Sequence, residues 1–350
     1  MSKLARVGPI GALAILVAIL PNFLPDLTFY VQMLLAAIVV TGLSLFMGYA
    51  GQASLGQGAF VAVGALTVAV TTVHLHWPPL LALLCAPVLS ALFAYLVGLP
   101  LLRLRGHYLA FGTLALLLIV QSLASTIPFL GGGVGITGIP ALGVGNLVIS
   151  SQIGYVYVAL AALAAVLIVS NNLVRSRFGR GVRALAGSES AAESAGVDVV
   201  RTKLAVFAVA AGFAGLAGGI SAFFIPYVSS ASVPAIASFT YVIVAVIGGL
   251  GTLWGGVVGA VLVSVLAQGL TNLSSTPGLP PTAGPILQYA AYATVLILSL
   301  TFLPRGIVPS LSAWWARGGW SRKSKQYPAA EPDTTGSPEL MPLGTSTIMN

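Results

Sequence analysis

Charge is almost absent from the middle of this chain. Residues 204–304 contain no Lys, Arg, Asp or Glu, and residues 8–172 contain only Asp26, Arg103 and Arg105. Proton- and ion-driven transporters usually keep an ionisable side chain inside the membrane as a relay, so this absence argues against both mechanisms. No Gly-x-x-x-x-Gly run is followed by lysine, which excludes a P-loop that could hold ATP. If the chain moves a solute uphill, another subunit must supply the energy.

Metal-ligating and disulfide-forming residues are scarce as well. Cys85 is the only cysteine, so no disulfide can form within the chain. His74 and His76 flank Leu75 in a predicted loop, but no Cys, Asp or Glu lies near them in the sequence. Because a metal site needs several such ligands, we expect no metal here. We also expect no cofactor and no enzymatic activity in this chain, because any ATP hydrolysis would lie on a separate partner subunit.

Apolar residues dominate what is present. The chain of 350 residues is 57% hydrophobic and 6% charged, with a mean hydropathy of +1.01 and 41 glycines, far outside the range of soluble proteins. A membrane-crossing helix needs roughly 20 mostly apolar residues, and the sequence supplies such runs repeatedly. It predicts an all-α, polytopic integral membrane protein with about 8–10 transmembrane helices. The predicted crossings lie near residues 8–20, 28–48, 55–73, 80–102, 108–128, 152–173, 204–225, 237–249, 255–270 and 286–303.

Basic residues set the predicted orientation. If every run crosses, all Lys and Arg residues fall on one side of the membrane, which the positive-inside rule makes the cytoplasm. Both termini would then be cytoplasmic. The net charge of +8 comes from these loops at the lipid surface and does not indicate a nucleic-acid partner. Residues 1–310 form the predicted transmembrane domain. Residues 311–350, rich in Pro, Ser, Thr, Gly and acids, are expected to form a largely disordered cytoplasmic tail.

The longest predicted cytoplasmic loop, residues 175–203, carries basic residues at both ends and small residues in the middle. Ser190 and Glu193 have the spacing of a capping box, and Gly196 suits a left-handed helix end. This pattern predicts a short surface helix with a small-residue face, which could dock into a groove of a partner. The same features are also typical of an ordinary loop helix that lies on the membrane.

A glycine-rich stretch, residues 48–58, lies between two of the apolar runs. Glycine costs about 1 kcal/mol against alanine in a helix interior, so the helix is expected to break here or to pack very closely. Irregular backbone at membrane depth is tolerated only where it is buried in protein or lines a cavity. The sequence is therefore compatible with two interpretations of this stretch, a substrate pathway and tight packing at a turn. The candidate pathway residues are Gly51, Gln52, Ser54, Gly56, Gln57 and Gly58.

Two further glycine patterns indicate close helix packing. Gly215 and Gly219 have the GxxxG spacing, and Gly251, Gly255 and Gly259 extend the same spacing over two steps. Small residues four apart share a helix face and let two backbones approach each other. We expect these five residues to be structural and not to line a substrate pathway.

The loop 175–203 resembles a known functional element. Ser190-Ala191-Ala192, three residues and Gly196 are similar to the Glu-Ala-Ala coupling motif of ABC importer permeases, with Ser190 in place of the leading Glu. Upstream, Phe178-Gly179-Arg180 and Ala184-Leu185 are similar to the same stretch in the branched-chain amino acid permeases of the M-type. Ala186-Gly187 stands where that family usually has an Arg-Glu pair.

The resemblance to this family extends over roughly residues 42–270. Residues 48–60 are similar to its glycine-rich signature, which often has His where Gln57 stands. Residues 102–115 match a second segment, and residues 248–256 match a third, in which Pro is common in place of Gly256. Each piece alone is weak, but their combined order is specific.

This resemblance implies an ABC importer permease fold and a role as the membrane-spanning subunit of an ATP-driven importer in a bacterial plasma membrane. The solute would be a branched-chain or other neutral amino acid. The implied partners are a second permease subunit in a heterodimer, two cytoplasmic ABC ATPases and an extracytoplasmic solute-binding protein. A permease for urea or short amides, or a passive channel without an ATPase, is also compatible with these residues. The implied ATPase-coupling residues are Arg180, Ser190, Ala191, Ala192, Glu193 and Gly196.

Overall fold

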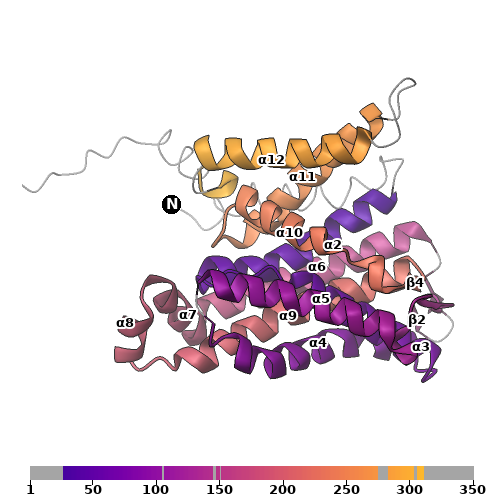
Figure 1. Ribbon diagram of the computed structural model, residues 1–350, viewed down its shortest axis with the longest axis horizontal. Coiled ribbons are helices and arrows are strands. Elements are labelled where there is room, and N and C mark those ends of the chain that lie inside the picture. Colours follow the sequence, from indigo (N-terminus) through magenta and orange to yellow (C-terminus); the bar gives the residue numbers. More distant parts are fainter. Residues whose placement is uncertain are drawn as a thin grey trace, which may run out of the picture. The chain divides into compact units, whose positions relative to one another are not determined.

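The computed structural model describes residues 27–104, 106–144, 147–149, 151–274, 283–302 and 306–310. All of these lie in Met1–Ser312, the first of two units into which the chain divides; the second is Ala313–Asn350. The predicted crossing at 8–20 and the predicted tail 311–350 fall outside the described residues. Helices account for most of the described residues, in line with the predicted all-α class (Figure 1).

The main helices are apolar. Their bounds are α2 Leu27–Leu43, which continues as the π-helical turn η2 Ser44–Tyr49, α3 Gln57–Val73, α4 Pro79–Leu101, α5 His107–Thr126, α6 Gln152–Arg175, α9 Val199–Phe224, α10 Ala235–Gly248, α11 Leu253–Ser274 and α12 Ala283–Phe302. Among the described residues, 7 spans are long and apolar enough to cross a membrane, and two shorter apolar helices lie at Gln57–Val73 and Ile286–Ser299. They coincide closely with the predicted crossings from 28–48 onward. The prediction of a polytopic all-α membrane protein is confirmed.

Local sequence signals explain where several helices begin. Ser151 caps α6 by accepting the N–H of Gly154 at 3.1 Å, and Asp198 caps α9 by accepting the N–H of Arg201 at 3.0 Å. Pro79 occupies the first position of α4. An N–H at this position would have no acceptor within the helix, so proline loses no hydrogen bond there. Most backbone hydrogen bonds are satisfied within the helices, as the hydrocarbon core of a membrane requires, although Pro87 inside α4 has no N–H to donate.

Helix α9 lies at the centre of the bundle, where it packs against α2, α3, α4 and α6 (Figure 1). Its glycines sit where these helices cross. A Cβ on Gly64 of α3 would collide with the backbone of Gly215, and a Cβ on Gly218 would collide with the carbonyl oxygen of Val61. A Cβ on Gly219 would lie 3.0 Å from a side chain of α4. Gly215 and Gly219 therefore lie at the contacts of α9 with α3 and α4, where small residues allow close approach.

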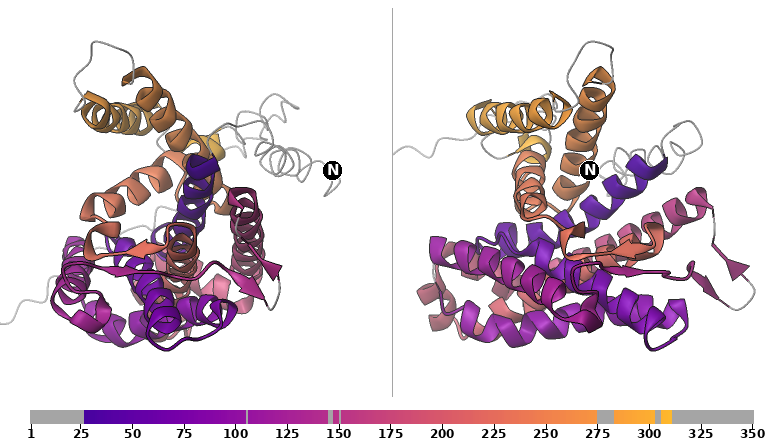
Figure 2. Two further views of the ribbon diagram at one scale, coloured as in Figure 1. Left: turned by 90° about the vertical axis from the view of Figure 1, so that its right-hand side faces the viewer. Right: turned by 45° about the vertical axis from the view of Figure 1, so that its right-hand side comes forward.

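Helices α10, α11 and α12 pack together on the α2 side of the bundle, with α11 against α2 (Figure 2). A Cβ on Gly248 of α10 would collide with the carbonyl oxygen of Gly255, and a Cβ on Gly259 would collide with the α10 backbone. Gly251 does not continue this helix face, contrary to the prediction. It lies in the turn before α11 with a φ of +80°, a conformation that favours glycine, and it touches Gly48.

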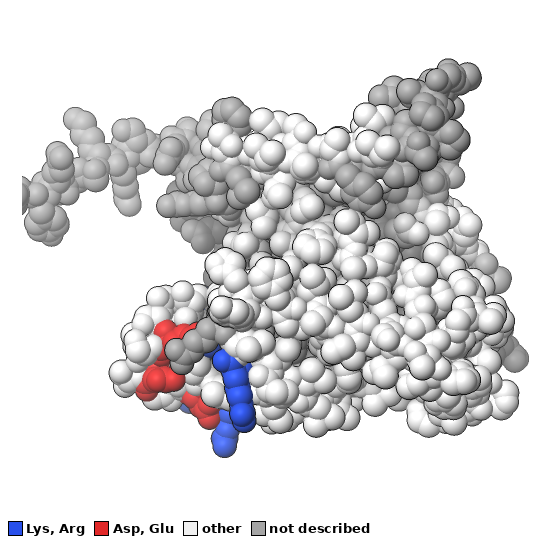
Figure 3. Space-filling view, in the orientation of Figure 1, with Lys and Arg blue, Asp and Glu red and all other residues white. Residues whose placement is uncertain are grey.

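One end of the bundle carries the charge. Between α6 and α9 the chain forms two short helices, α7 Arg177–Gly187 and α8 Glu189–Ser194. Every charged residue that the structure describes lies here or just past the end of α4. These residues are Arg103, Arg175, Arg177, Arg180, Arg183, Glu189, Glu193, Asp198, Arg201 and Lys203. Figure 3 shows those visible from one side gathered around α7 and α8.

The opposite end carries short strands and no charged residue within the described segments. Strand β1 (Ile136–Thr137) pairs antiparallel with β4 (Tyr227–Val228), and β2 (Gly143–Val144) pairs antiparallel with β3 (Leu147–Val148). The β1–β4 pair joins the connection after α5 to the connection after α9, whereas β2 and β3 both lie in the connection after α5. We call this end the strand end and the other the charged end.

Candidate functional site

Helix α2 leads into a non-helical segment, residues 50–56, before α3 begins. Gly51 has a φ of +67°, and a Cβ at this position would lie 3.4 Å from Ala186 of α7. One helical turn earlier, Gly48 touches Gly251 in the turn between α10 and α11. The helix break expected in residues 48–58 is present, and its first half packs against α7 and the turn between α10 and α11.

The second half of this segment runs between α5 and α10. Leu55 donates its N–H to Oγ1 of Thr113 in α5 at 2.9 Å, and Gly58 donates its N–H to Oγ of Ser238 in α10 at 3.0 Å. A Cβ on Gly56 would lie 2.7 Å from the carbonyl oxygen of Thr113. Hydroxyl groups from two other helices thus accept N–H groups that have no intrahelical partner at the start of α3.

Two polar side chains of the segment are buried. Ser54 is 0% exposed and Gln57 is 1% exposed. Ser54 Oγ accepts the N–H of Gly56 at 3.3 Å, whereas neither Oε1 nor Nε2 of Gln57 has a hydrogen-bond partner among the described residues. An unsatisfied buried polar group costs about 1–3 kcal/mol. The Gln57 amide is therefore a place where a solute or a water molecule would gain hydrogen bonds.

The loop 175–203 folds into α7 and α8, which meet at Ser188. This residue caps α8, because its Oγ accepts the N–H of Ala191 at 3.4 Å. The predicted capping box of Ser190 and Glu193 is wrong. Ser188 has the extended backbone (φ −164°, ψ 125°) that an N-cap requires, whereas Ser190 already lies inside the first turn, with its hydroxyl 3.1 Å from that of Ser188.

A small apolar cluster holds α8 against α7 and α9. Leu185, Ala192 and Val199 are buried together, and Val197 packs against them. Gly196 makes the turn that brings Val197 back, with a φ of +79°. This is the left-handed helix end that the sequence predicted. The remaining residues of the coupling motif, Arg180, Ser190, Ala191 and Glu193, are exposed to solvent.

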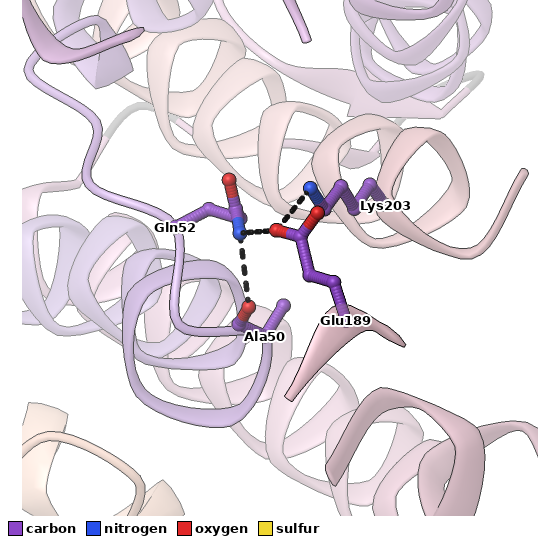
Figure 4. A network of polar contacts seen from close by, with 4 residues as sticks. All are labelled: Ala50, Gln52, Glu189 and Lys203. Atoms are coloured by element: carbon purple, nitrogen blue, oxygen red, sulfur yellow. Dashed lines mark hydrogen bonds and ion pairs between the residues drawn. The ribbon is translucent and has the colours of Figure 1, made fainter. Parts of the chain in front are cut away.

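Glu189 connects α8 to the glycine-rich segment. Its Oε1 lies 2.5 Å from Nζ of Lys203 in α9 and accepts a hydrogen bond from Nε2 of Gln52 at 3.4 Å. The same Nε2 donates to the carbonyl oxygen of Ala50 at 3.5 Å. Figure 4 shows the three side chains converging from three separate parts of the chain. One carboxylate therefore joins α8, the central helix α9 and the break after α2.

Burial makes this ion pair different from its neighbour. The side chain of Lys203 is 7% exposed and that of Glu189 is 40% exposed. Removing one partner of a fully buried pair costs about 3–5 kcal/mol, and less here because Glu189 still reaches solvent. The pair of Arg201 and Asp198 is exposed on both sides, and such surface pairs contribute about 0–1 kcal/mol. Sequence reasoning missed Glu189 and Lys203; the one signal was that Lys203 is the only lysine in residues 8–304.

An open pocket of about 610 Å³ lies beside this network. Its lining combines three separate elements of the charged end. They are Gly51, Gln52 and Ala53 of the break, Gly106 and His107 at the start of α5, and Glu189, Ser190 and Glu193 of α8. A group that enters this pocket from the aqueous side would touch both α8 and the glycine-rich segment.

A second cavity, of about 520 Å³, lies among α2, α9, α10, α11 and α12 and reaches the strand end at Ser232. No charged residue lines it. Its polar lining consists of hydroxyl and amide groups, on Gln32, Ser221, Ser232, Thr240, Tyr241, Ser264, Gln268, Thr271, Gln288 and Tyr292. None of the six candidate pathway residues lines this cavity, although Val61, one helical turn beyond Gln57, does. We call it the neutral cavity.

The histidine pair lies at the strand end. The ring of His74 stacks on Phe129, with ring centroids 5.2 Å apart, and His76 follows in the turn with a φ of +52°. Within the part of the chain that the structure describes, no group of three or more His, Cys, Asp or Glu residues could hold a metal ion.

Comparison with known families gives this arrangement its context. A family model described as "Branched-chain amino acid transport system / permease component" matches residues 27–302, a stretch that includes every helix named above. The chain belongs to this permease family. It is accordingly a multi-pass membrane protein of the bacterial inner membrane, and the break, α7 and α8 all lie inside the matched permease region.

Individual relatives agree with the family assignment. The high-affinity branched-chain amino acid transport system permease protein LivM of Salmonella typhimurium is 30% identical over 299 residues, which cover 78% of this chain and 67% of the relative. LivM of Escherichia coli is 29% identical with the same coverage. The galactose/methyl galactoside import permease protein MglC of Haemophilus influenzae is 28% identical over 152 residues, 41% of this chain and 42% of the relative. No solved structure matches the chain significantly.

Proposed function

We propose that this permease is the membrane-spanning subunit of an ATP-driven importer for branched-chain or other neutral amino acids. Two relatives are named for branched-chain amino acid transport and a third for galactose import. These solutes share one property, because a zwitterionic amino acid and a sugar both carry no net charge. The proposal concerns this class of solute.

The observation that carries the proposal is the neutral cavity. Its volume of about 520 Å³ lies within the range of about 300–1,000 Å³ that is typical of small-molecule sites. Its hydroxyl and amide groups suit the ammonium and carboxylate groups of a zwitterion, and its apolar walls suit a branched side chain. The described membrane-spanning helices hold no ionisable Asp, Glu, Lys or Arg in their middle portions that could relay an ion.

Energy would then come from the charged end. In this proposal α7 and α8 dock onto cytoplasmic ABC ATPases, a second permease subunit completes the membrane complex, and a solute-binding protein delivers the solute at the strand end. The positive-inside rule supports a cytoplasmic location for the charged end, because the described loops of the strand end carry no Lys or Arg. Both termini would lie on the cytoplasmic side.

The proposal is tested by the energy source of uptake. In proteoliposomes that contain the complex, internal ATP and external binding protein, leucine uptake should continue when proton and sodium gradients are collapsed and stop when ATP is depleted. A complex whose ATPase cannot hydrolyse ATP is the control. Uptake that survives ATP depletion but needs an ion gradient would instead identify a secondary transporter.

A further inference from the structure

We infer that Gln52 and Glu189 form the link through which an ATPase docked on α8 moves the glycine-rich segment, and this inference rests on the proposed function. Both residues lie at the charged end, 137 positions apart in the sequence. Neither is a solute-binding residue in this inference, because neither lines the neutral cavity. They act as positioning residues for the transport cycle.

Glu189 occupies the right place for such a link. It is the first residue of α8, directly after the cap Ser188, and the next residues of α8 present the exposed coupling motif. Its carboxylate is fixed on the other side by Lys203, whose side chain is almost fully buried in the central helix α9. A force applied to α8 therefore acts on Glu189 while α9 provides a fixed reference.

Gln52 passes the movement to the backbone of the break. Its Nε2 donates to Glu189 Oε1 at 3.4 Å and to the carbonyl oxygen of Ala50 at 3.5 Å, so one amide bridges α8 and the end of η2 (Figure 4). Residues 50–56 are not helical, and such a segment can change its backbone angles without breaking a regular hydrogen-bond ladder.

Beyond the break, the first turn of α3 contacts a helix that lines the neutral cavity. Gly58 is hydrogen-bonded to Ser238 of α10 at 3.0 Å, and Ala237 and Tyr241 on the same helix line that cavity. Between Gln52 and Gly58 the chain can span at most about 20 Å, so the two ends of this short segment cannot move apart beyond that distance. The structure thus connects α8 to α10 in the cavity wall through residues 52–58 and the hydrogen bonds that Gln52 and Gly58 make at the two ends of this segment.

An exchange of the two side chains tests the link. Gln52→Glu places two carboxylates beside Lys203, and Glu189→Gln leaves Lys203 without one. The double variant Q52E/E189Q keeps one carboxylate and one amide of the same lengths around the same lysine. Gln52→Ala is a milder variant, because it removes the bridge but leaves the Lys203–Glu189 pair intact. Arg201→Gln, which breaks the exposed pair with Asp198 on the first turn of α9, is the matched control.

Three quantities are measured for each purified complex: ATPase retained, ATP hydrolysed and leucine taken up per ATP. Gln52→Ala and both single charge variants should retain the ATPase and keep hydrolysis, but uptake per ATP should fall about tenfold, a typical size for coupling between sites. The double variant should recover most of the uptake. Arg201→Gln should match the unmodified complex.

Several outcomes would overturn the inference. Normal coupling in Gln52→Ala would show that the bridge transmits nothing, and a double variant as impaired as the singles would show that the two residues do not act as a pair. Loss of the ATPase from the single variants would show that Gln52, Glu189 and Lys203 only support docking of the ATPase and do not transmit movement. Failure of the proposed function looks different: the unmodified chain would bind no ATPase or would transport without ATP.

Discussion

Gly196 closes the coupling helix in a backbone conformation that other residues adopt at a cost. Its φ is +79°, and a Cβ built there would meet no atom within 4 Å, so any penalty comes from the backbone and not from a collision. For a residue with a Cβ, this left-handed conformation costs roughly 1–2 kcal/mol in conformational energy. The turn also lets Val197 donate its N–H to Ala192 at 3.0 Å and join the small cluster under α8.

Replacing Gly196 with Val should therefore uncouple the importer without preventing its assembly into the membrane. The strained turn would move Val197 out of its cluster and shift the exposed face of α8. We expect solute-stimulated ATP hydrolysis in the reconstituted complex to be abolished. Gly269→Val is the control, because Gly269 also has open space around its Cα but lies within α11 without a positive φ. Normal stimulation in Gly196→Val would remove α8 from the coupling path.

Individual residues differ in how far the sequence alone could place them. Gly196 was predictable because a glycine three residues after a helical pattern marks a local turn. The partners of Glu189 were not, since Lys203 is 14 positions away and Gln52 is 137 positions away, and only the fold brings them together. The cap of α8 was misplaced because two serines, Ser188 and Ser190, both fit, and the end of α7 decides between them.

The crossing of α3 and α9 depends on direct backbone contact. Gly64→Val should destabilise the protein strongly, because its side chain would enter the backbone of Gly215, and overpacking of this kind costs about 1–3 kcal/mol or more. A lower unfolding temperature of the detergent-solubilised protein would show this. Gly133→Val, at a position with no neighbour within 4 Å, should leave the unfolding temperature unchanged. Equal stability of the two variants would mean that the helices separate more easily than the structure implies.

The neutral cavity makes a prediction that does not depend on coupling. In a background without Cys85, a cysteine at Ser264 should react with a small thiol reagent, and a transported amino acid should slow that reaction. Ser170→Cys is the control, since Ser170 is 0% exposed in α6 and does not line the cavity. If no neutral amino acid slows the labelling of Ser264→Cys, the solute passes elsewhere.

Apolar helices were the most predictable elements, because a membrane leaves few alternatives to a long apolar helix. The break after α2 was also predictable, since four glycines between two apolar runs cannot continue a helix cheaply. Its role was not: Gly51 packs on α7 while Gly58 binds Ser238, and no periodicity indicates which helix a turn will meet. Gly251 was assigned to a helix face by spacing alone, although its φ places it in a turn.

The separation of the two ends of the molecule predicts its orientation in the cell. In a background without Cys85, a cysteine at Ser188 should resist a membrane-impermeant thiol reagent in intact cells and react in inverted vesicles. A cysteine at Val134, which is 81% exposed at the strand end, should show the opposite pattern. Labelling of Ser188→Cys from outside would reverse the direction of every helix.

Confinement of charge to one end also decides how the protein responds to voltage. A membrane potential does work of about 2.3 kcal/mol on each elementary charge moved through 100 mV, and the middle portions of the described membrane-spanning helices hold no Lys, Arg, Asp or Glu to be moved. Rearrangements of these helices are therefore electrically silent, as is the passage of a zwitterion. Leucine uptake should proceed at the same rate when a potassium diffusion potential of either sign is imposed on the proteoliposomes. The importer can thus run in an energised or a depolarised cell alike.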